Sequence, residues 1–200
     1  MPTIDADAHV LETEQTWESM DGADKKYRPK LVGSTDGGSK DEYWLVDGTL
    51  RLKSGNVGRN TPQAAREMRD VPARLKHMDE LGVDIQVLYP TLFLIPLTAR
   101  PEVELALCRS YNRWLAELWR HGKERLRWAA IVPLMTMEQS LAEARFAKEN
   151  GACAIFMRGT EGDRLLSDPY FFPLYQEASR LDLAIGVHAD RKSTRLNSSH

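Results

Sequence analysis

Apolar positions along the chain follow two different spacings, and the two alternate. Short, nearly continuous apolar runs over residues 83–89, 128–132, 152–157 and 183–188 are typical of buried strands, and residues 4–10 form a further candidate strand. Apolar residues at helical spacing between these runs predict helices over 70–82, 101–122, 136–151 and 168–181. Five strands separated by helices predict a parallel sheet with right-handed crossovers.

Several helix ends carry recognisable capping residues. Asp70 precedes a proline in the first turn of its helix, and Gly82 follows the last turn. Thr136 and Gln139 have the spacing of a capping box, in which each side chain bonds the backbone at the other position. These residues predict where two of the helices begin.

Two architectures fit this order of elements: an open doubly wound sheet, and the beginning of a (β/α)8 (TIM) barrel. Neither GxGxxG nor a P-loop sequence occurs, which argues against nucleotide-binding versions of the open sheet. A barrel carries its chemistry at the carboxyl ends of its strands. Because Asp7 and His9, Arg158 and His188 all stand at such ends, we predict an α/β fold with about the first five β/α units of a barrel.

The segment at about residues 12–61 interrupts this order after the first strand. It is polar and rich in glycine, and within it residues 43–46 and 49–52 flank Asp47-Gly48. An Asp-Gly pair supplies the positive φ angles of a two-residue type I′ turn, so this part predicts a β-hairpin. We expect the segment to lie over the mouth of the active site and to shape specificity.

Composition excludes several classes of protein. A net charge of −2 with both signs scattered gives no support for binding nucleic acid or a membrane surface. Cys108 and Cys153 lie in separate apolar contexts, so no disulfide framework is expected, which fits a cytoplasmic protein. No signal peptide is recognisable, and the longest apolar run, residues 92–97, is too short to span a membrane.

Residues 5–9, Asp-Ala-Asp-Ala-His, hold the most suggestive chemistry. In a regular strand, Asp5, Asp7 and His9 would all face the same way. A carboxylate and an imidazole two residues apart form a ready pair of metal ligands, although a polar N-terminal tail would look the same. Asp5 is expected either to be a buried helper of the metal pair or to lie at the surface.

The chain resembles the amidohydrolase-related family, in the branch of aminocarboxymuconate semialdehyde decarboxylase and other metal-dependent carboxy-lyases. The matching segments occur in the family's order and cover most of residues 1–189. They are IDADAHV at 4–10, RLKHMDELGVDIQVLYPT at 74–91, SYNRWL at 110–115, LSDP at 166–169 and IGVHA at 185–189.

This resemblance implies a barrel that holds one divalent metal ion, with Zn²⁺ as the first expectation and Mn²⁺ as the second. Asp7, His9 and His188 correspond to metal ligands. The family commonly has HxH on the first strand, and this chain has Asp in the first place. Acidic residues occur there among the decarboxylases, and a carboxylate favours harder ions such as Mn²⁺. We therefore expect a parent enzyme that decarboxylates or hydrolyses a small carboxylic acid.

Residues 190–200, Asp-Arg-Lys-Ser-Thr-Arg-Leu-Asn-Ser-Ser-His, do not continue the α/β pattern. They match the translation of a common sequencing adapter, so we interpret them as a non-native tail and residues 1–189 as an N-terminal fragment. The remaining catalytic residues are then expected in the missing C-terminal part. The alternative is a non-catalytic fragment with an incomplete metal site. Whether the parent forms a homo-oligomer is left open.

Other polar residues have competing interpretations. Arg158 could bind a substrate carboxylate through its fork of donors, or form a structural salt bridge. Tyr89 could line the substrate pocket or pack in the core. His77 and His121 are expected on the solvent side of their helices.

Overall fold

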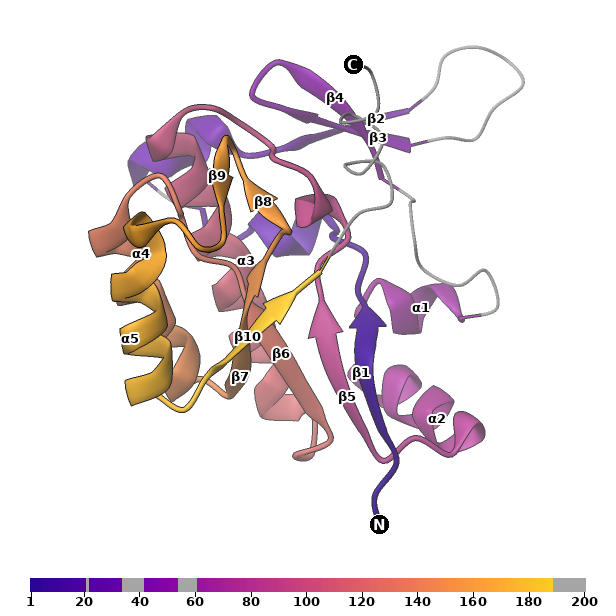
Figure 1. Cartoon of the computed structure of the whole chain (residues 1–200). Coiled ribbons are helices and arrows are strands. Elements are labelled where there is room, and N and C mark those ends of the chain that lie inside the picture. Colours follow the sequence, from indigo (N-terminus) through magenta and orange to yellow (C-terminus); the bar gives the residue numbers. More distant parts are fainter. Residues whose placement is uncertain (21, 34–41, 54–60, 189–200) are drawn as a thin grey trace, which may run out of the picture.

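A curled parallel sheet with helices on its outer face forms the body of the chain (Figure 1). The computed structural model describes residues 1–20, 22–33, 42–53 and 61–188. The predicted tail at 190–200 lies outside these residues, as do parts of the segment predicted at about 12–61.

The five strands of the main sheet follow the chain order, β1-β5-β6-β7-β10, and every neighbouring pair is parallel. Their bounds are Ile4–His9, Ile85–Tyr89, Leu126–Ala130, Ala152–Met157 and Ala184–Val187. This is the predicted arrangement of the first part of a (β/α)8 barrel, with strand ends displaced by one or two residues. Within the described residues, β1 and β10 each pair on one side only.

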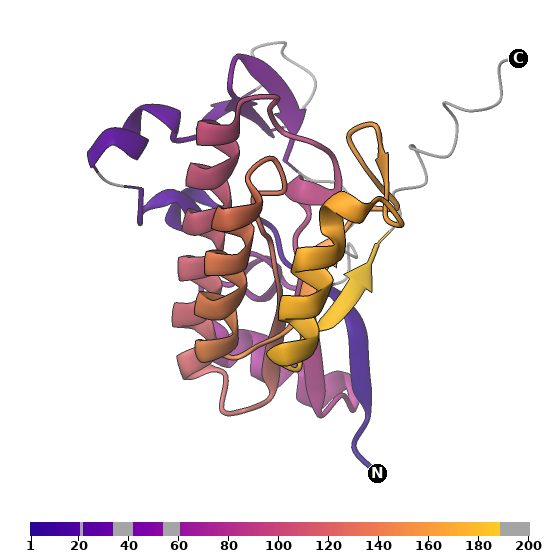
Figure 2. The ribbon, with the colours of Figure 1, turned by 60° about the vertical axis from the view of Figure 1, so that its left-hand side comes forward.

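Helices α3, α4 and α5 cover one face of the sheet, as Figure 2 shows, and α2 packs beside β1 and β5. The bounds are Val71–Leu81 for α2, Pro101–His121 for α3, Met137–Glu149 for α4 and Phe172–Arg180 for α5, and the short α1 spans Gln63–Arg66. Buried side chains between sheet and helices, such as Trp128, Ile155 and Leu107, form the larger of two cores. A smaller core lines the inner face of the sheet. No helix in the described part of the chain is long and apolar enough to cross a membrane.

The helix ends only partly follow the predicted capping. Gly82 ends α2 in the left-handed conformation, with φ of 67°. Asp70 and Thr136 occupy the N-cap positions, but neither side chain makes a capping hydrogen bond. The predicted capping box was therefore wrong, because Gln139 instead accepts a hydrogen bond from Arg109 Nη2 of α3 at 2.9 Å. Packing of α4 on α3 takes this side chain away from the local cap.

The segment after β1 contains a three-stranded antiparallel sheet, β2 (Lys30–Gly33), β3 (Glu42–Val46) and β4 (Thr49–Leu52). The predicted hairpin is confirmed: Asp47 and Gly48 have φ of 45° and 77°, as a type I′ turn requires. This sheet lies beyond the carboxyl ends of β1 and β5 (Figure 1). It is tied to the loop after β5, where Arg51 Nη2 donates to the carbonyl of Pro96.

Strand β1 departs from the regular alternation that was assumed from its sequence. Asp5 pairs with Gln86 and Ala8 pairs with Leu88, so three steps along β1 correspond to two along β5. The extra residue makes a β-bulge at Ala6-Asp7. The expectation that Asp5, Asp7 and His9 share one face was therefore wrong, because the Asp5 carboxylate turns to Gln86 instead.

Candidate metal centre

Three potential ligands converge at the carboxyl ends of the two outer strands of the sheet. Asp7 and His9 come from β1, and His188 follows β10. His188 Nε2 lies 2.9 Å from Asp7 Oδ1 and 3.0 Å from His9 Nε2, and 3.6 Å separates His9 Nε2 from Asp7 Oδ1. The structure thus brings together the three residues that the sequence indicated, although they are up to 181 positions apart.

The ring of His9 is held in one orientation by the backbone. Its Nδ1 lies 2.8 Å from the carbonyl oxygen of Pro90, which can only accept, so Nδ1 carries the proton. The lone pair of Nε2 then faces Asp7 and His188. Burial, followed by the nearby His188, lowers the pKa of His9, which favours the neutral imidazole that a metal ion requires.

His188 is fixed mainly by its backbone. Its amide donates to the carbonyl of Met157 at 3.0 Å and so extends the pairing of β10 with β7. The two imidazole nitrogens and the carboxylate oxygen lie about 3 Å from one another. Donor atoms that share one ion, with bonds of about 2.1 Å, have this spacing. A shared cation would also relieve the crowding of these lone pairs. The donor set of two nitrogens and one oxygen fits Zn²⁺ or Mn²⁺.

Tyr89, at the end of β5, lies beside this cluster. Its ring centroid is 5.7 Å from that of His188 and 6.4 Å from that of His9. It lines a cavity of about 400 Å³ together with Ala6, Asp7, Val187 and His188. A Cβ at Gly186 would come within 2.5 Å of the Tyr89 hydroxyl oxygen, so glycine leaves room for the ring on β10. Tyr89 also belongs to the inner core, which was one of its two expected surroundings, and its contact with a substrate stays a prediction.

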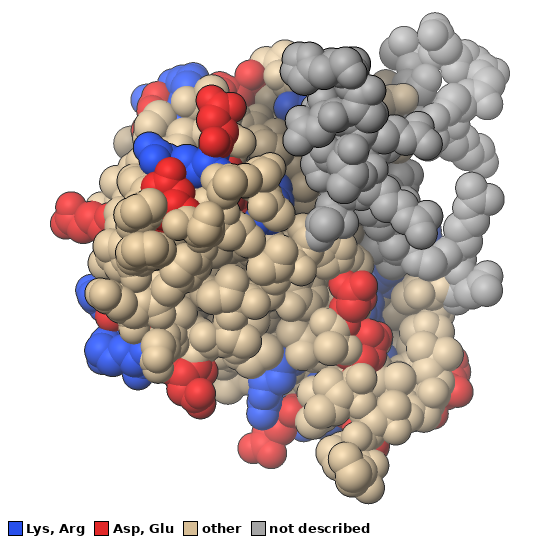
Figure 3. All heavy atoms as spheres, viewed as in Figure 1, with Lys and Arg blue, Asp and Glu red and all other residues tan. Residues whose placement is uncertain are grey.

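The open face of the sheet carries this cluster and is turned toward the viewer in Figure 3. On the part that is described, charged side chains gather mainly around the periphery and uncharged atoms occupy the middle. Ile4 and Val187, on the two outer strands, are 55% exposed each. Asp7, His9 and His188 thus form a polar group at the carboxyl edge of a largely uncharged face.

Arg158 follows β7 and is mostly buried. Its Nη2 forms an ion pair with Glu161, and its Nη1 donates to the carbonyl of Phe93 at 2.9 Å. The structure thus contains the salt bridge that was one of the two expectations. Burial raises the pKa of Glu161, and the neighbouring guanidinium opposes that rise. Both residues line a cavity of about 830 Å³ between the loops after β5, β6 and β7 and the start of α3.

Glu12 is a buried acid whose role the sequence did not reveal. Its carboxylate accepts from the backbone amides of Thr91 and Leu92, both at 3.0 Å, so it holds the loop whose Pro90 carbonyl orients His9. Burial raises its pKa to about 7. An isolated acid directly after a strand was the available signal.

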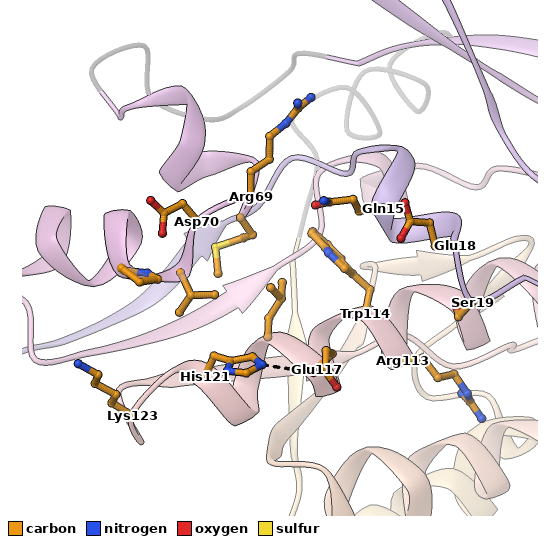
Figure 4. A pocket seen from close by; sticks show the side chains of 14 residues that line it. Gln15, Glu18, Ser19, Arg69, Asp70, Arg113, Trp114, Glu117, His121 and Lys123 are labelled. Carbon is orange, nitrogen blue, oxygen red and sulfur yellow. Dashed lines mark hydrogen bonds and ion pairs between the residues drawn. The ribbon is translucent and has the colours of Figure 1, made fainter.

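A further hollow lies on the helix side of the sheet, away from the cluster (Figure 4). It has a volume of about 730 Å³ and lies between the start of α2 and the end of α3. Trp114 and Val71 are among its buried apolar side chains. His121 reaches its rim, where it contacts Glu117 at 3.3 Å and is exposed as expected. The prediction for His77 was wrong, because only 13% of its side chain is exposed.

The comparisons with known proteins agree on one family. The sequence model described as Amidohydrolase matches residues 4–198. A curated relative, 2-amino-3-carboxymuconate-6-semialdehyde decarboxylase of Dictyostelium discoideum, is 27% identical over 120 residues, which are 60% of this chain and 33% of that protein.

Solved structures share the fold. An amidohydrolase from Mycobacterium avium subsp. paratuberculosis superposes with a TM-score of 0.74 at 19% identity over 96% of this chain and 60% of that one. The 5-carboxyvanillate decarboxylase LigW of Sphingomonas paucimobilis gives 0.64 at 16% identity over 100% and 56%. A manganese-bound 5-carboxyvanillate decarboxylase of Novosphingobium aromaticivorans gives 0.60 at 20% identity over 94% and 50%.

The chain spans about a third of the length of the curated relative in the aligned part, and between half and three fifths of these solved structures. Its strand order, the position of the ligand cluster at the strand ends and the match over residues 4–198 agree with one another. The chain belongs to the amidohydrolase family.

Proposed function

We propose that the chain is the N-terminal part of a metal-dependent decarboxylase that acts on a small aromatic or unsaturated carboxylic acid. The convergence of Asp7, His9 and His188 on one point carries this proposal. The acidic residue in the first ligand place and the curated decarboxylase relative favour a carboxy-lyase over a hydrolase.

The protein residues have distinct tasks in this proposal. Asp7, His9 and His188 would hold the ion, which when bound polarises a substrate oxygen or lowers the pKa of water. The Pro90 carbonyl keeps the proton of His9 on Nδ1, so Nε2 remains a donor of electrons. Tyr89 would contact the substrate, since its ring lines the same cavity as Asp7 and His188.

We propose Arg158 as the second substrate-binding residue, through its guanidinium. Two of its nitrogens already bond Glu161 and the Phe93 carbonyl, and its Nε is buried without a hydrogen-bond partner among the residues that the structure describes. A substrate carboxylate would compete with Glu161 for this guanidinium.

A second candidate is hydrolysis of a small ester, amide or C–C substrate, which the family as a whole favours. The third alternative is a non-catalytic fragment. The three ligands come from the two outer strands of the sheet. The other catalytic groups are expected in the missing part of a longer parent. Measurement of metal binding at the cluster separates this third alternative from the first two.

The test of the metal centre is metal content. The full chain, loaded with Zn²⁺ or Mn²⁺ and dialysed, should retain about one ion per chain by atomic emission analysis. His9→Ala and His188→Ala each remove one donor and should lose the ion. His121→Ala removes an exposed histidine of α3 and should retain it. Stoichiometric metal in both His9→Ala and His188→Ala would refute the ligand assignment.

The test of the reaction is product analysis on the parent enzyme. Incubated with aromatic and unsaturated carboxylic acids, a decarboxylase should release CO₂ in step with loss of the acid. Release of an alcohol, an amine or a second carboxylic acid instead would establish the hydrolase alternative.

A further inference from the structure

Behind the proposed ligand pair lies a chain of buried polar groups that the metal itself would not touch. Arg74 of α2 is only 3% exposed, although it carries a full charge. Its Nε donates to Gln86 Oε1 at 2.7 Å. Gln86 Nε2 in turn donates to Asp5 Oδ2 at 2.9 Å. Guanidinium, amide and carboxylate thus connect α2, β5 and β1 in series.

Both ends of this series reach the backbone of the ligands. Asp5 Oδ1 accepts from the backbone amide of Asp7 at 3.2 Å. Both terminal nitrogens of Arg74 lie 3.3 Å from the carbonyl oxygen of His9, and Nη1 also bonds the Ala65 carbonyl. The backbone of β1 is therefore held at both ligands, at the amide of Asp7 and at the carbonyl of His9.

The bulge explains why such support is needed. At Ala6-Asp7 the regular pairing with β5 is interrupted, and within this stretch the Asp7 amide donates to Asp5 Oδ1. Asp5 thus ties the irregular stretch to its own side chain. Without it, the bulged segment would have several conformations of similar energy, and the exposed Asp7 carboxylate would not stay 2.9 Å from His188.

The chemistry of residue 86 is specific to this task. Gln86 is 4% exposed and stands in the otherwise apolar strand Ile85–Tyr89. Its side-chain amide accepts from Arg74 and donates to Asp5 at the same time. Its orientation is fixed by its partners, because a flipped amide would set donor against donor and acceptor against acceptor.

We propose that Asp5, Gln86 and Arg74 form a positioning relay that holds the bulge of β1 and thereby places Asp7 and His9 for the metal. This inference rests on the proposed metal centre. None of the three residues is a catalytic residue, since none touches the cavity beside the cluster. Outer groups that orient metal ligands typically change metal affinity about 10- to 100-fold when they are replaced.

Two substitutions separate positioning from general support of the fold. Gln86→Glu keeps an acceptor for Arg74 and strengthens that pair, but it removes the donor to Asp5 and places a second carboxylate beside it. Asp5→Asn leaves one oxygen for two donors. Both should weaken Mn²⁺ and Zn²⁺ binding by about 10-fold or more, while the thermal midpoint of the metal-free Gln86→Glu chain stays at or above that of the wild type.

The matched control is Asp84→Asn. Asp84 also accepts from a backbone amide beside β1, that of Thr3 at 2.7 Å, but it stands outside the relay. Metal affinity is measured in the full chain by electron paramagnetic resonance titration of free Mn²⁺, and for Zn²⁺ by competition with a chromogenic chelator. Asp84→Asn should bind both ions as the wild type does.

The outcomes distinguish the relay from the metal centre. Wild-type affinity in both Gln86→Glu and Asp5→Asn, together with loss of binding in His188→Ala, would overturn the relay and leave the metal centre intact. Affinity and thermal midpoint that fall together in both variants would also overturn it, because the residues would then only support the fold. A wild-type chain that binds neither ion would overturn the metal centre of this chain and the relay that rests on it.

Discussion

The positions of individual side chains were predicted well where strand order decides them, and less well where burial decides them. Asp7, His9 and His188 were brought together as indicated, because strand ends of a parallel sheet meet at one edge. Asp5 was placed on the wrong face, since strict alternation does not anticipate a bulge. Arg74 and Gln86 were overlooked, although a charge on an apolar helix face and an amide in an apolar strand are visible signals.

Glu12 leads to a prediction about pH. Its pKa rises from 4.5 to about 7 on folding, so the folded state binds a proton that the unfolded state has released between these values. Its contribution is therefore most favourable below pH 4.5 and is lost as pH rises to about 7. The loss approaches about 3 kcal/mol, at 1.36 kcal/mol for each pH unit between the two pKa values.

Measurement of unfolding by urea at pH 5 and pH 8 checks this expectation. Glu12→Gln removes the ionisation and should reduce the fall in the free energy of unfolding between the two pH values. Glu14→Gln changes an exposed acid nearby and should leave the fall unchanged. An equal fall in the wild type and in Glu12→Gln would contradict the assignment to Glu12.

Whole elements followed from hydrophobic spacing, and their ends were less well predicted. The order of five strands and four intervening helices was predicted, because buried runs and amphipathic faces depend on local sequence. The cap of α4 was not, because the partner of Gln139 is on another helix.

The ends of α2 and α4 give a prediction with an internal control. Gly82 and Gly151 both have positive φ, of 67° and 86°. A Cβ at Gly151 would lie 2.1 Å from the ring of Trp119, whereas a Cβ at Gly82 would meet no atom of the described residues within 4 Å.

Gly82→Ala should lower the free energy of unfolding by about 1 kcal/mol, because only the left-handed backbone conformation opposes the new side chain. Gly151→Ala should cost roughly 2–4 kcal/mol in chemical denaturation, since the Trp119 ring must move. Equal costs would show that the ring yields freely.

At the scale of the whole molecule, the main sheet has two outer strands, β1 and β10, each paired on one side only among the described residues. Such edges, flanked by the exposed Ile4 and Val187, invite pairing between chains. In the fragment interpretation, further strands would cover them in the parent. That interpretation and the match of 190–200 to a sequencing adapter stay predictions, and recovery of the parent gene is their direct test.

The edges predict association of the isolated chain. Sedimentation velocity should show oligomers that grow with concentration, and Val187→Lys should reduce them, because a charge on an edge opposes strand addition. Leu50→Lys, at an equally exposed leucine on the outer strand β4 of the smaller sheet, is the matched control. A reduction as large as that of Val187→Lys would place the association at the smaller sheet instead. A monomer at every concentration, with a cooperative thermal transition and measurable turnover, would contradict both this prediction and the fragment interpretation.

The bulge in β1 also bears on how the first strand tolerates changes in length. Pairing Asp5 with Gln86 and Ala8 with Leu88 leaves Ala6 as the surplus residue. Removal of Ala6 would restore one-to-one pairing and still leave Asp5 beside Gln86 and Asp7 on the inner face. Relatives that are one residue shorter at this point could thus keep the same ligands with a straight strand. Alignments of this strand should therefore place a gap at Ala6, before the ligand pair, and not between Asp7 and His9.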